Sequence, residues 1–259
     1  MAPLAVRRRT IFPNLFNRFS SSAPELKQRL HLREILRQKV FGSDLSEQLF
    51  PDKDLPEVVR VCALFVERNG ISLSGIYRLS GISSNISRLR ATFDSGETPD
   101  LESDDQVMAD VHCVSSLLKL YFRLLPNPLM TFESYDDFVR LFRDDSLDDT
   151  QRLTQMRRLC RRLPPPHFRT LKALVFHLRK VSFSAQNTGM TAKNLSIVWA
   201  PNLLRSPEIE SRSLSGDLAA LQVIGIQAVL TEYLIQNCDD IFDDTITDTN
   251  DSPASPQLT

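Results

Sequence analysis

The sequence predicts an all-α fold, and three observations support this prediction. Apolar residues recur at the 3.6-residue spacing of amphipathic helices along most of the 259-residue chain. The apolar–polar alternation that is typical of strands is scarce, and only 8 residues are glycine. With 42% hydrophobic and 24% charged residues, the composition is that of an ordinary globular protein. We therefore expect a single helical domain.

The net charge of −1 hides an uneven distribution along the chain. Residues 1–40 contain nine Lys or Arg and two Glu, whereas residues 239–259 contain six Asp and no basic residue. We therefore divide the chain into a basic arm (1–39), which we expect to be flexible with one short helix, a domain (40–243), and an acidic Ser/Thr/Pro tail (244–259), which we expect to be disordered.

The basic arm allows three interpretations. It contains Arg7-Arg8-Arg9 together with Phe12, Phe16 and Phe19, and it has no acidic residue before Glu25. It can be a disordered leader. It can bind an anionic membrane surface, because basic clusters are attracted to anionic lipid and interleaved Phe can insert. The composition also fits a mitochondrial presequence.

Several classes of protein are disfavoured by the sequence. No apolar run approaches the 18 residues of a membrane span. The histidines lack the spacing of metal ligands, so we expect them to be structural and expect no metal site. The cysteines lie far apart on apolar helical patterns, which favours buried, reduced thiols in an intracellular protein. The four cysteines are Cys62, Cys113, Cys160 and Cys238.

In the first half of the domain, start and stop signals outline three helices. A helix is predicted from Pro56 to about Arg68, where Asn69-Gly70 ends it. We expect Ser83 or Ser84 to cap a second helix, which Gly96 closes. The third is expected to start at Asp110 as its cap and to run to about Leu125, where Pro126 stops it.

In the second half, amphipathic helices are predicted at about 132–143, 150–162, after Pro164, at 192–199 and at 218–237. The acidic loop 144–149 can chelate a cation or cap the helix that follows. We favour capping, because the loop lacks the glycine and the spacing of a calcium site. Thr191 is expected to cap the helix at 192–199, and Pro201 is expected to end it.

The loop from Gly75 to Gly81, with the sequence GIYRLSG, connects the first two of these helices. A glycine at each end allows sharp turns. Ile76, Tyr77 and Leu79 can fix the loop to a core, so that Arg78 points outward on a short rigid mount. Arg78 can therefore be an ordinary surface arginine, or it can be a guanidinium that reaches the phosphates of another molecule.

Two other stretches carry candidate binding residues. Lys119 and Arg123 are four residues apart, on one side of a helix and away from its apolar stripe. They can form a solvated basic face or be presented to an anionic partner. Asn194 stands in the first turn of its helix and can cap that helix or contact a partner.

Together, the stretches 75–81, 119–129 (KLYFRLLPNPL) and 194–204 (NLSIVWAPNLL) resemble the RhoGAP domain, which activates Rho-family small GTPases. The resemblance covers about residues 40–243, and the order and spacing of the three motifs make it specific. Val40–Leu45 and Ser80–Arg90 look closest to the subgroup that includes CdGAP, whose members act on Rac- and Cdc-type GTPases.

The resemblance implies a role for each matching residue. Arg78 occupies the position of the arginine finger, a catalytic arginine that is supplied in trans to the GTPase. Lys119 and Arg123 match the basic pair that supports the finger loop and the GTPase contact. Asn194 matches an asparagine that meets the GTPase, and Pro201 is a weaker interface candidate. The other loop residues expected to support the finger are Gly75, Tyr77 and Gly81.

The resemblance further implies a GTPase activator rather than an independent enzyme, with GTP and Mg²⁺ held by the partner GTPase and no cofactor of its own. A RhoGAP-shaped binding module or scaffold with little activity is the alternative. We expect a cytoplasmic protein that regulates the cytoskeleton, with peripheral membrane contact through the arm and no role in nucleic-acid binding. Two residues depart from the family pattern, namely Ser74, often acidic in the family, and Leu124, where the family commonly has Glu.

Overall fold

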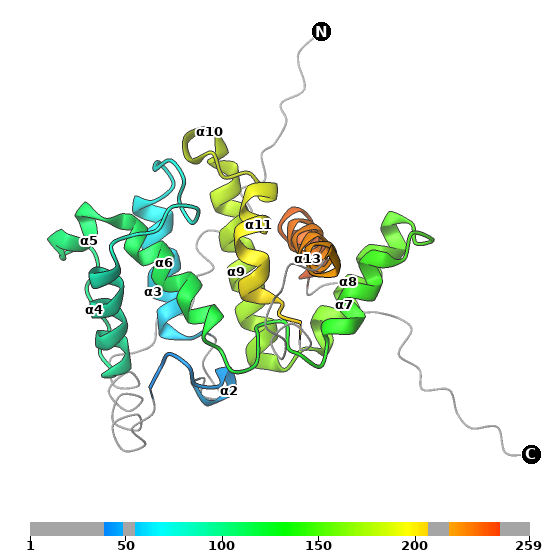
Figure 1. Cartoon of the computed structure of the whole chain (residues 1–259), viewed down its shortest axis with the longest axis horizontal. Helices are drawn as coiled ribbons and strands as arrows, with labels where there is room; N and C mark the ends of the chain where they lie inside the picture. The colour runs from blue at the N-terminus through cyan, green and yellow to red at the C-terminus, as the bar shows by residue number, and fades with distance from the viewer. Residues whose placement is uncertain (1–38, 49–54, 207–217, 244–259) are drawn as a thin grey trace, which may run out of the picture.

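The computed structural model describes residues 39–48, 55–206 and 218–243, and these residues form helices without any strand (Figure 1). The all-α prediction is therefore confirmed. The predicted flexibility of the arm and the tail lies outside the described residues. The described helices are α2 (Leu45–Gln48), α3 (Glu57–Asn69), α4 (Ser83–Asp94), α5 (Asp105–Ala109), α6 (Val111–Arg123), α7 (Tyr135–Arg143), α8 (Asp149–Arg162), α9 (Pro165–Phe183), α10 (Ala185–Thr188), α11 (Ala192–Leu203), α13 (Leu218–Gln236) and α14 (Cys238–Ile241).

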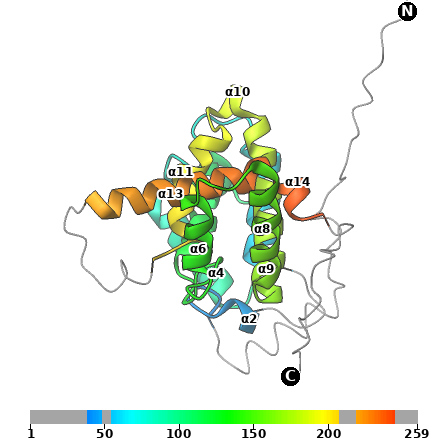
Figure 2. The ribbon, with the colours of Figure 1, turned by 90° about the vertical axis from the view of Figure 1, so that its right-hand side faces the viewer.

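The helices pack around one continuous core. Helix α3 packs against α6, α6 against α11, and α11 along α13, while α9 contacts α3, α11 and α13. Figure 2 shows α13 crossing the molecule, with α8 and α9 side by side beneath it. Trp199, Tyr77 and Phe122 are among the largest side chains that are fully buried in this core. Burial of each such side chain contributes about 1.5–3 kcal/mol to stability.

The start of α8 shows why the acidic loop has its sequence. The Asp148 carboxylate accepts a hydrogen bond from the backbone N–H of Gln151, whose side chain accepts one from the Asp148 N–H in return. This capping box satisfies two backbone donors at the helix start. Asp144, at the other end of the loop, accepts hydrogen bonds from Ser146. The capping interpretation is confirmed for Asp148.

The predictions about the starts of α4 and α6 were partly wrong, and one interaction explains both errors. Ile82, rather than Ser83 or Ser84, is the N-cap residue of α4. Asp110 is the N-cap residue of α6, but its side chain does not cap that helix. The Asp110 carboxylate instead accepts the backbone N–H of Ile82 at 2.7 Å. Asp110 thus serves the helix that starts 28 residues earlier, which local sequence rules could not show.

The prediction that Pro201 ends its helix was wrong, because α11 continues through Pro201 to Leu203. A proline in a helix removes one backbone hydrogen bond. The turn keeps a polar contact from Asn202, whose Nδ2 donates to the carbonyl of Val198 at 2.9 Å. Packing along α13 then favours continuation of the helix. The short helices α2, α5, α10 and α14 were not predicted.

The structure also bears on the predictions about cysteines, membrane spans and metal sites. All four cysteines are buried and free, as predicted. Among the described helices, none combines the length and the apolar character needed to cross a membrane. Within the same part of the chain, no three His, Cys, Asp or Glu side chains gather in a way that could hold a metal ion.

Gly81, at the end of the Gly75–Gly81 loop, has no room for a side chain, whereas Gly225 in α13 has open space around it. Substitutions at these two positions test how closely the loop packs on α6. An added Cβ at Gly81 would lie only 2.1 Å from the backbone nitrogen of Cys113 in α6, whereas one at Gly225 in α13 would meet nothing within 4 Å. We expect Gly81→Ala to lower the free energy of unfolding by about 3 kcal/mol, because loop and helix must separate.

The matched variant Gly225→Ala should raise the free energy of unfolding by about 1 kcal/mol, because alanine is the better helix former. Urea unfolding of both variants measures the two effects. Equal stability of the two variants would show that the loop does not rest on the α6 backbone.

Candidate functional site

The Gly75–Gly81 loop connects α3 to α4 and lies at the end of the molecule that carries α10 (Figure 1). Its two ends are bound to different helices. The Gly75 N–H donates to the carbonyl of Thr188 in α10 at 2.7 Å. The Gly81 N–H donates to the Ser116 hydroxyl of α6 at 3.1 Å. The loop is therefore anchored on both sides.

Two consecutive residues of this loop point in opposite directions. Tyr77 is fully buried, with 0% of its surface exposed, whereas Arg78 is exposed. The Arg78 side chain makes no hydrogen bond or ion pair with any other residue that the structure describes. The guanidinium is thus held on a fixed backbone, and its donors remain available to another molecule.

Gly75 permits this geometry in two ways. Its φ of +73° belongs to the left-handed region, which favours glycine. A Cβ at this position would also lie 2.8 Å from Leu79 Cγ and 3.5 Å from Arg78 Nη2. A larger residue would therefore displace the side chains that stand over the start of the loop.

Beneath the loop, aromatic rings form a rigid base. The Tyr77 ring lies 5.0 Å from that of Trp199 in α11, and Trp199 lies 5.8 Å from Phe122 in α6, both in edge-on arrangements. Tyr77 itself has a φ of +67°, which is rare for a bulky residue and is retained only where surrounding contacts enforce it. The backbone next to Arg78 is therefore fixed by packing.

The structure separates the roles of Lys119 and Arg123. Lys119 is half-buried, and its Nζ donates a hydrogen bond to the backbone carbonyl of Tyr77. Burial lowers the pKa of Lys119. Arg123 lies one turn further along α6, is exposed, and its side chain binds no other described residue. Lys119 is thus in direct contact with the loop, whereas Arg123 faces outward.

Asn194 joins the same assembly through α10. Its Nδ2 donates to the carbonyl of Gly189 at 2.8 Å, while Thr191, as predicted, caps α11 by accepting the Asn194 N–H. Gly189 follows Thr188, the residue that accepts the Gly75 N–H. Asn194 and the loop are therefore linked through a single short turn.

Pro201 and the two residues that depart from the family pattern make none of the hydrogen bonds described above. Pro201 is exposed on α11 and makes no hydrogen bond to the loop within the described residues. Leu124, which replaces the glutamate common in the resembled family, packs partly against the core. Ser74 is exposed directly before Gly75.

Large apolar side chains are exposed close to Arg78 in the chain and on α11, the helix that carries Trp199. Leu79 is 47% exposed, Ile82 is 58% exposed, and Ile197 on α11 is 56% exposed. Exposed large apolar side chains near a charged group are typical of a surface that binds another protein.

Sequence reasoning missed three polar residues beneath the loop. The Tyr77 hydroxyl lies 2.5 Å from Nε2 of His177 in α9. His177 Nδ1 lies 2.9 Å from the Glu67 carboxylate of α3, which also accepts a hydrogen bond from Lys180 at 2.5 Å. The two residues in each of these three contacts are 100 or more positions apart in the chain, so no local pattern could reveal the contacts.

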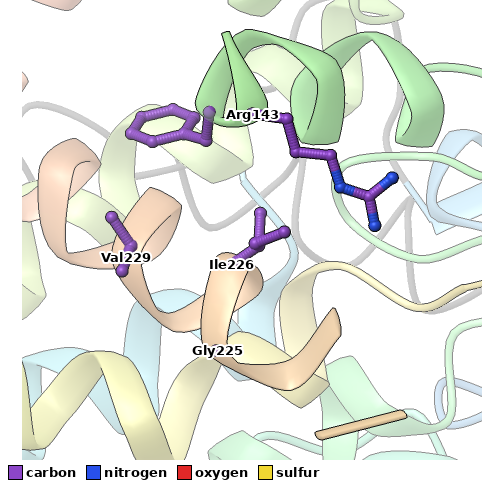
Figure 3. Close-up of a pocket in the computed structure, with 5 residues that line it drawn as sticks. Arg143, Gly225, Ile226 and Val229 are labelled. Atoms are coloured by element: carbon purple, nitrogen blue, oxygen red, sulfur yellow. The ribbon is translucent and has the colours of Figure 1, made fainter. Parts of the chain in front are cut away.

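The cysteine next to the loop is not activated as a nucleophile. The Cys113 backbone contacts the loop, but burial raises the pKa of its thiol to about 12, so the sulfur remains protonated at neutral pH. A separate pocket between α7 and α13 is lined by residues outside the loop, α6 and α11 (Figure 3). Those residues are Phe142, Arg143, Gly225, Ile226 and Val229.

Curated relatives match most of this chain. It is 52% identical over 229 residues to the GTPase-activating protein CdGAPr of Drosophila melanogaster, which covers 88% of this chain and 12% of that protein. It is 45% identical over 203 residues to human Rho GTPase-activating protein 31, covering 78% of this chain and 14% of that protein. The chain thus spans about an eighth of the length of these relatives.

Solved structures share the fold. The crystal structure of human Rho GTPase activating protein 15 superposes with a TM-score of 0.70 at 29% identity, over 86% of this chain and 99% of that one. The BH domain from GRAF, the GTPase regulator associated with focal adhesion kinase, gives a TM-score of 0.60 at 29% identity, over 72% of this chain and 93% of that one. The RhoGAP domain model matches residues 56–208, and the chain therefore belongs to the RhoGAP domain family.

Proposed function

We propose that this chain stimulates GTP hydrolysis by a Rho-family small GTPase, and that Arg78 enters the active site of that GTPase as an arginine finger. The main support is the exposed Arg78 guanidinium, which has no partner among the described residues, beside the fully buried Tyr77. Such a side chain is positioned in advance and leaves no partner in the described part of the chain when it binds phosphate oxygens.

The chemistry explains why an arginine is needed. Negative charge develops on the phosphate oxygens during hydrolysis, and an arginine supplied in trans stabilises this charge in a site that is closed to water. This contribution is worth about 10³–10⁵ in rate, or roughly 4–7 kcal/mol of barrier. The planar guanidinium can bind two oxygens at once and remains protonated. The partner GTPase holds GTP and Mg²⁺, so the chain is an activator and not an enzyme by itself.

The neighbouring residues have supporting roles in this proposal. Lys119 holds the loop through the Tyr77 carbonyl. The Arg123 side chain has no partner among residues 39–48, 55–206 and 218–243, and it would bind an acidic or carbonyl group of the GTPase. Asn194 Nδ2 binds Gly189, while the amide oxygen of Asn194 has no partner in the same ranges and can accept a hydrogen bond from the GTPase. Pro201 would lie at the edge of the contact.

The type of GTPase that we propose as the partner is inferred from similar proteins. Rac- or Cdc-type GTPases are favoured, because the chain resembles the CdGAP subgroup and is 52% identical to a GTPase-activating protein named CdGAPr. We place this activity in the cytoplasm, with the basic arm at residues 1–39 available to an anionic membrane surface. A RhoGAP-shaped binding module without activity is the competing function, and a hydrolysis assay separates the two.

The finger assignment is tested by replacing Arg78. We expect Arg78→Ala to lower the maximal rate of stimulated hydrolysis about 10³-fold or more, while the Kd for the GTP-loaded partner changes by less than about threefold. Arg78→Lys should restore little of the rate, because lysine offers a point charge in place of the planar fork. Single-turnover hydrolysis with a panel of Rho-family GTPases measures both variants. Near-normal stimulation by Arg78→Ala would refute the assignment.

The docking role of Arg123 is tested by charge reversal. Arg123→Glu should raise the Kd for a partner loaded with a non-hydrolysable GTP analogue by roughly tenfold or more, because it places a negative charge on the contact surface. Arg158→Glu is the matched control, since Arg158 is exposed on α8 and the change in charge is the same. Titration calorimetry provides the comparison. Equal Kd values for the two variants would remove Arg123 from the interface.

A further inference from the structure

A continuous series of hydrogen bonds runs from the Gly75–Gly81 loop into the core. The Tyr77 hydroxyl meets His177 Nε2 at 2.5 Å, His177 Nδ1 meets Glu67 Oε1 at 2.9 Å, and Lys180 Nζ meets Glu67 Oε2 at 2.5 Å. The series joins the loop to α9 and α3. Tyr77 and His177 are fully enclosed, and only the Lys180 end reaches the surface.

The surroundings of Tyr77 and Glu67 fix the protonation states of both side chains. Burial, together with the nearby Cys62 and Glu67, raises the pKa of Tyr77 well above its ordinary value, so the phenol keeps its proton at neutral pH. Because a carboxylate only accepts hydrogen bonds, His177 Nδ1 carries a proton and donates to Glu67, whereas Nε2 and the Tyr77 hydroxyl share one hydrogen bond whose direction depends on the tautomer. Burial alone would raise the pKa of Glu67, but hydrogen bonds and charge from His177 and Lys180 outweigh this and lower it, so Glu67 is a carboxylate.

Tyr77 is therefore held in two ways, by a hydrogen bond between its hydroxyl and His177 and by packing of its ring. This matters because the backbone at Tyr77, with a φ of +67°, lies in the left-handed region, where a bulky residue is strained. Three contacts oppose this strain, namely the hydroxyl on His177, the ring on Trp199 and the carbonyl bound by Lys119. Since Tyr77 and Arg78 share a peptide bond, any relaxation at Tyr77 rotates the backbone that carries the guanidinium.

We propose that Tyr77, His177 and Glu67 form a positioning device, which holds the loop in the strained conformation that aims Arg78 before a GTPase binds. This inference rests on the proposed function. Tyr77 and His177 are positioning residues, because they act through Arg78 and contact no substrate. A phenylalanine at position 77 would fill the same volume but would lose the hydroxyl contact that ties the loop to α9.

The test compares two variants that each remove one buried hydroxyl. Tyr77→Phe deletes the bond to His177, whereas Tyr121→Phe deletes the hydroxyl that donates to Gln48 at 2.9 Å. Both lose one buried hydrogen bond, so both should lower stability to a similar extent. In single-turnover hydrolysis, Tyr77→Phe should lower the maximal rate roughly tenfold or more, while its half-saturating concentration changes less than about twofold. Tyr121→Phe should leave both quantities at the wild-type value.

A second comparison tests whether the loss of rate in Tyr77→Phe acts through Arg78. In an Arg78→Ala background, Tyr77→Phe should cause no further loss of rate, because the device has no finger to aim. His177→Gln should reproduce the loss seen in Tyr77→Phe, and it serves as the test if the tyrosine variant folds poorly. A wild-type maximal rate for either variant, or an equal loss in the Arg78→Ala background, would overturn the positioning role.

These outcomes also separate the inference from the proposed function. If Arg78→Ala abolishes stimulation while Tyr77→Phe retains the full rate, only the positioning role fails. If Arg78→Ala itself stimulates normally, the finger and the positioning role fail together.

Discussion

The opposite orientation of Tyr77 and Arg78 is the constraint on which the candidate site depends. A buried tyrosine directly precedes an exposed arginine, and a left-handed backbone joins them. The tyrosine occupies the centre of the helical core, between α9 and α11. The arginine therefore takes its position from the whole fold, although it stands in a loop of seven residues. A loop without this anchor would lose conformational freedom only when a partner binds, at a cost in rate or affinity.

Three helices around the loop supply four anchors. Helix α6 contributes Lys119 and Ser116, α10 binds Gly75 through Thr188, and α9 contributes His177. Because these anchors come from separate parts of the chain, the loop can be rigid only in the folded domain. Exposed groups of the loop and of the helices that anchor it or lie beneath it include Arg78, Arg123 and the apolar side chains Leu79, Ile82 and Ile197. Such a combination of cations and apolar side chains suits a protein partner better than a small molecule.

Much of this organisation could be predicted from the sequence. Helical periodicity identified most helices, and the two glycines and the apolar residues of 75–81 indicated an anchored loop with an outward arginine. Errors arose where distant residues intervene. Asp110 binds the start of α4, and packing along α13 carries α11 through Pro201. Tyr77 binds His177 of α9, which in turn binds Glu67 of α3. Local propensity contains no information about such contacts, whose sequence separation reaches 110 residues.

The central claim is that Arg78 interacts with charge that exists only in the transition state. The most direct measurement compares the Kd of the chain for a Rho-family GTPase loaded with GDP alone and with GDP plus aluminium fluoride, which mimics the transferring phosphoryl group. We predict that fluoride strengthens binding of the wild-type chain by two or more orders of magnitude, roughly as expected for a transition-state analogue, and leaves Arg78→Ala almost unchanged. An equal gain in affinity for both chains would contradict the claim.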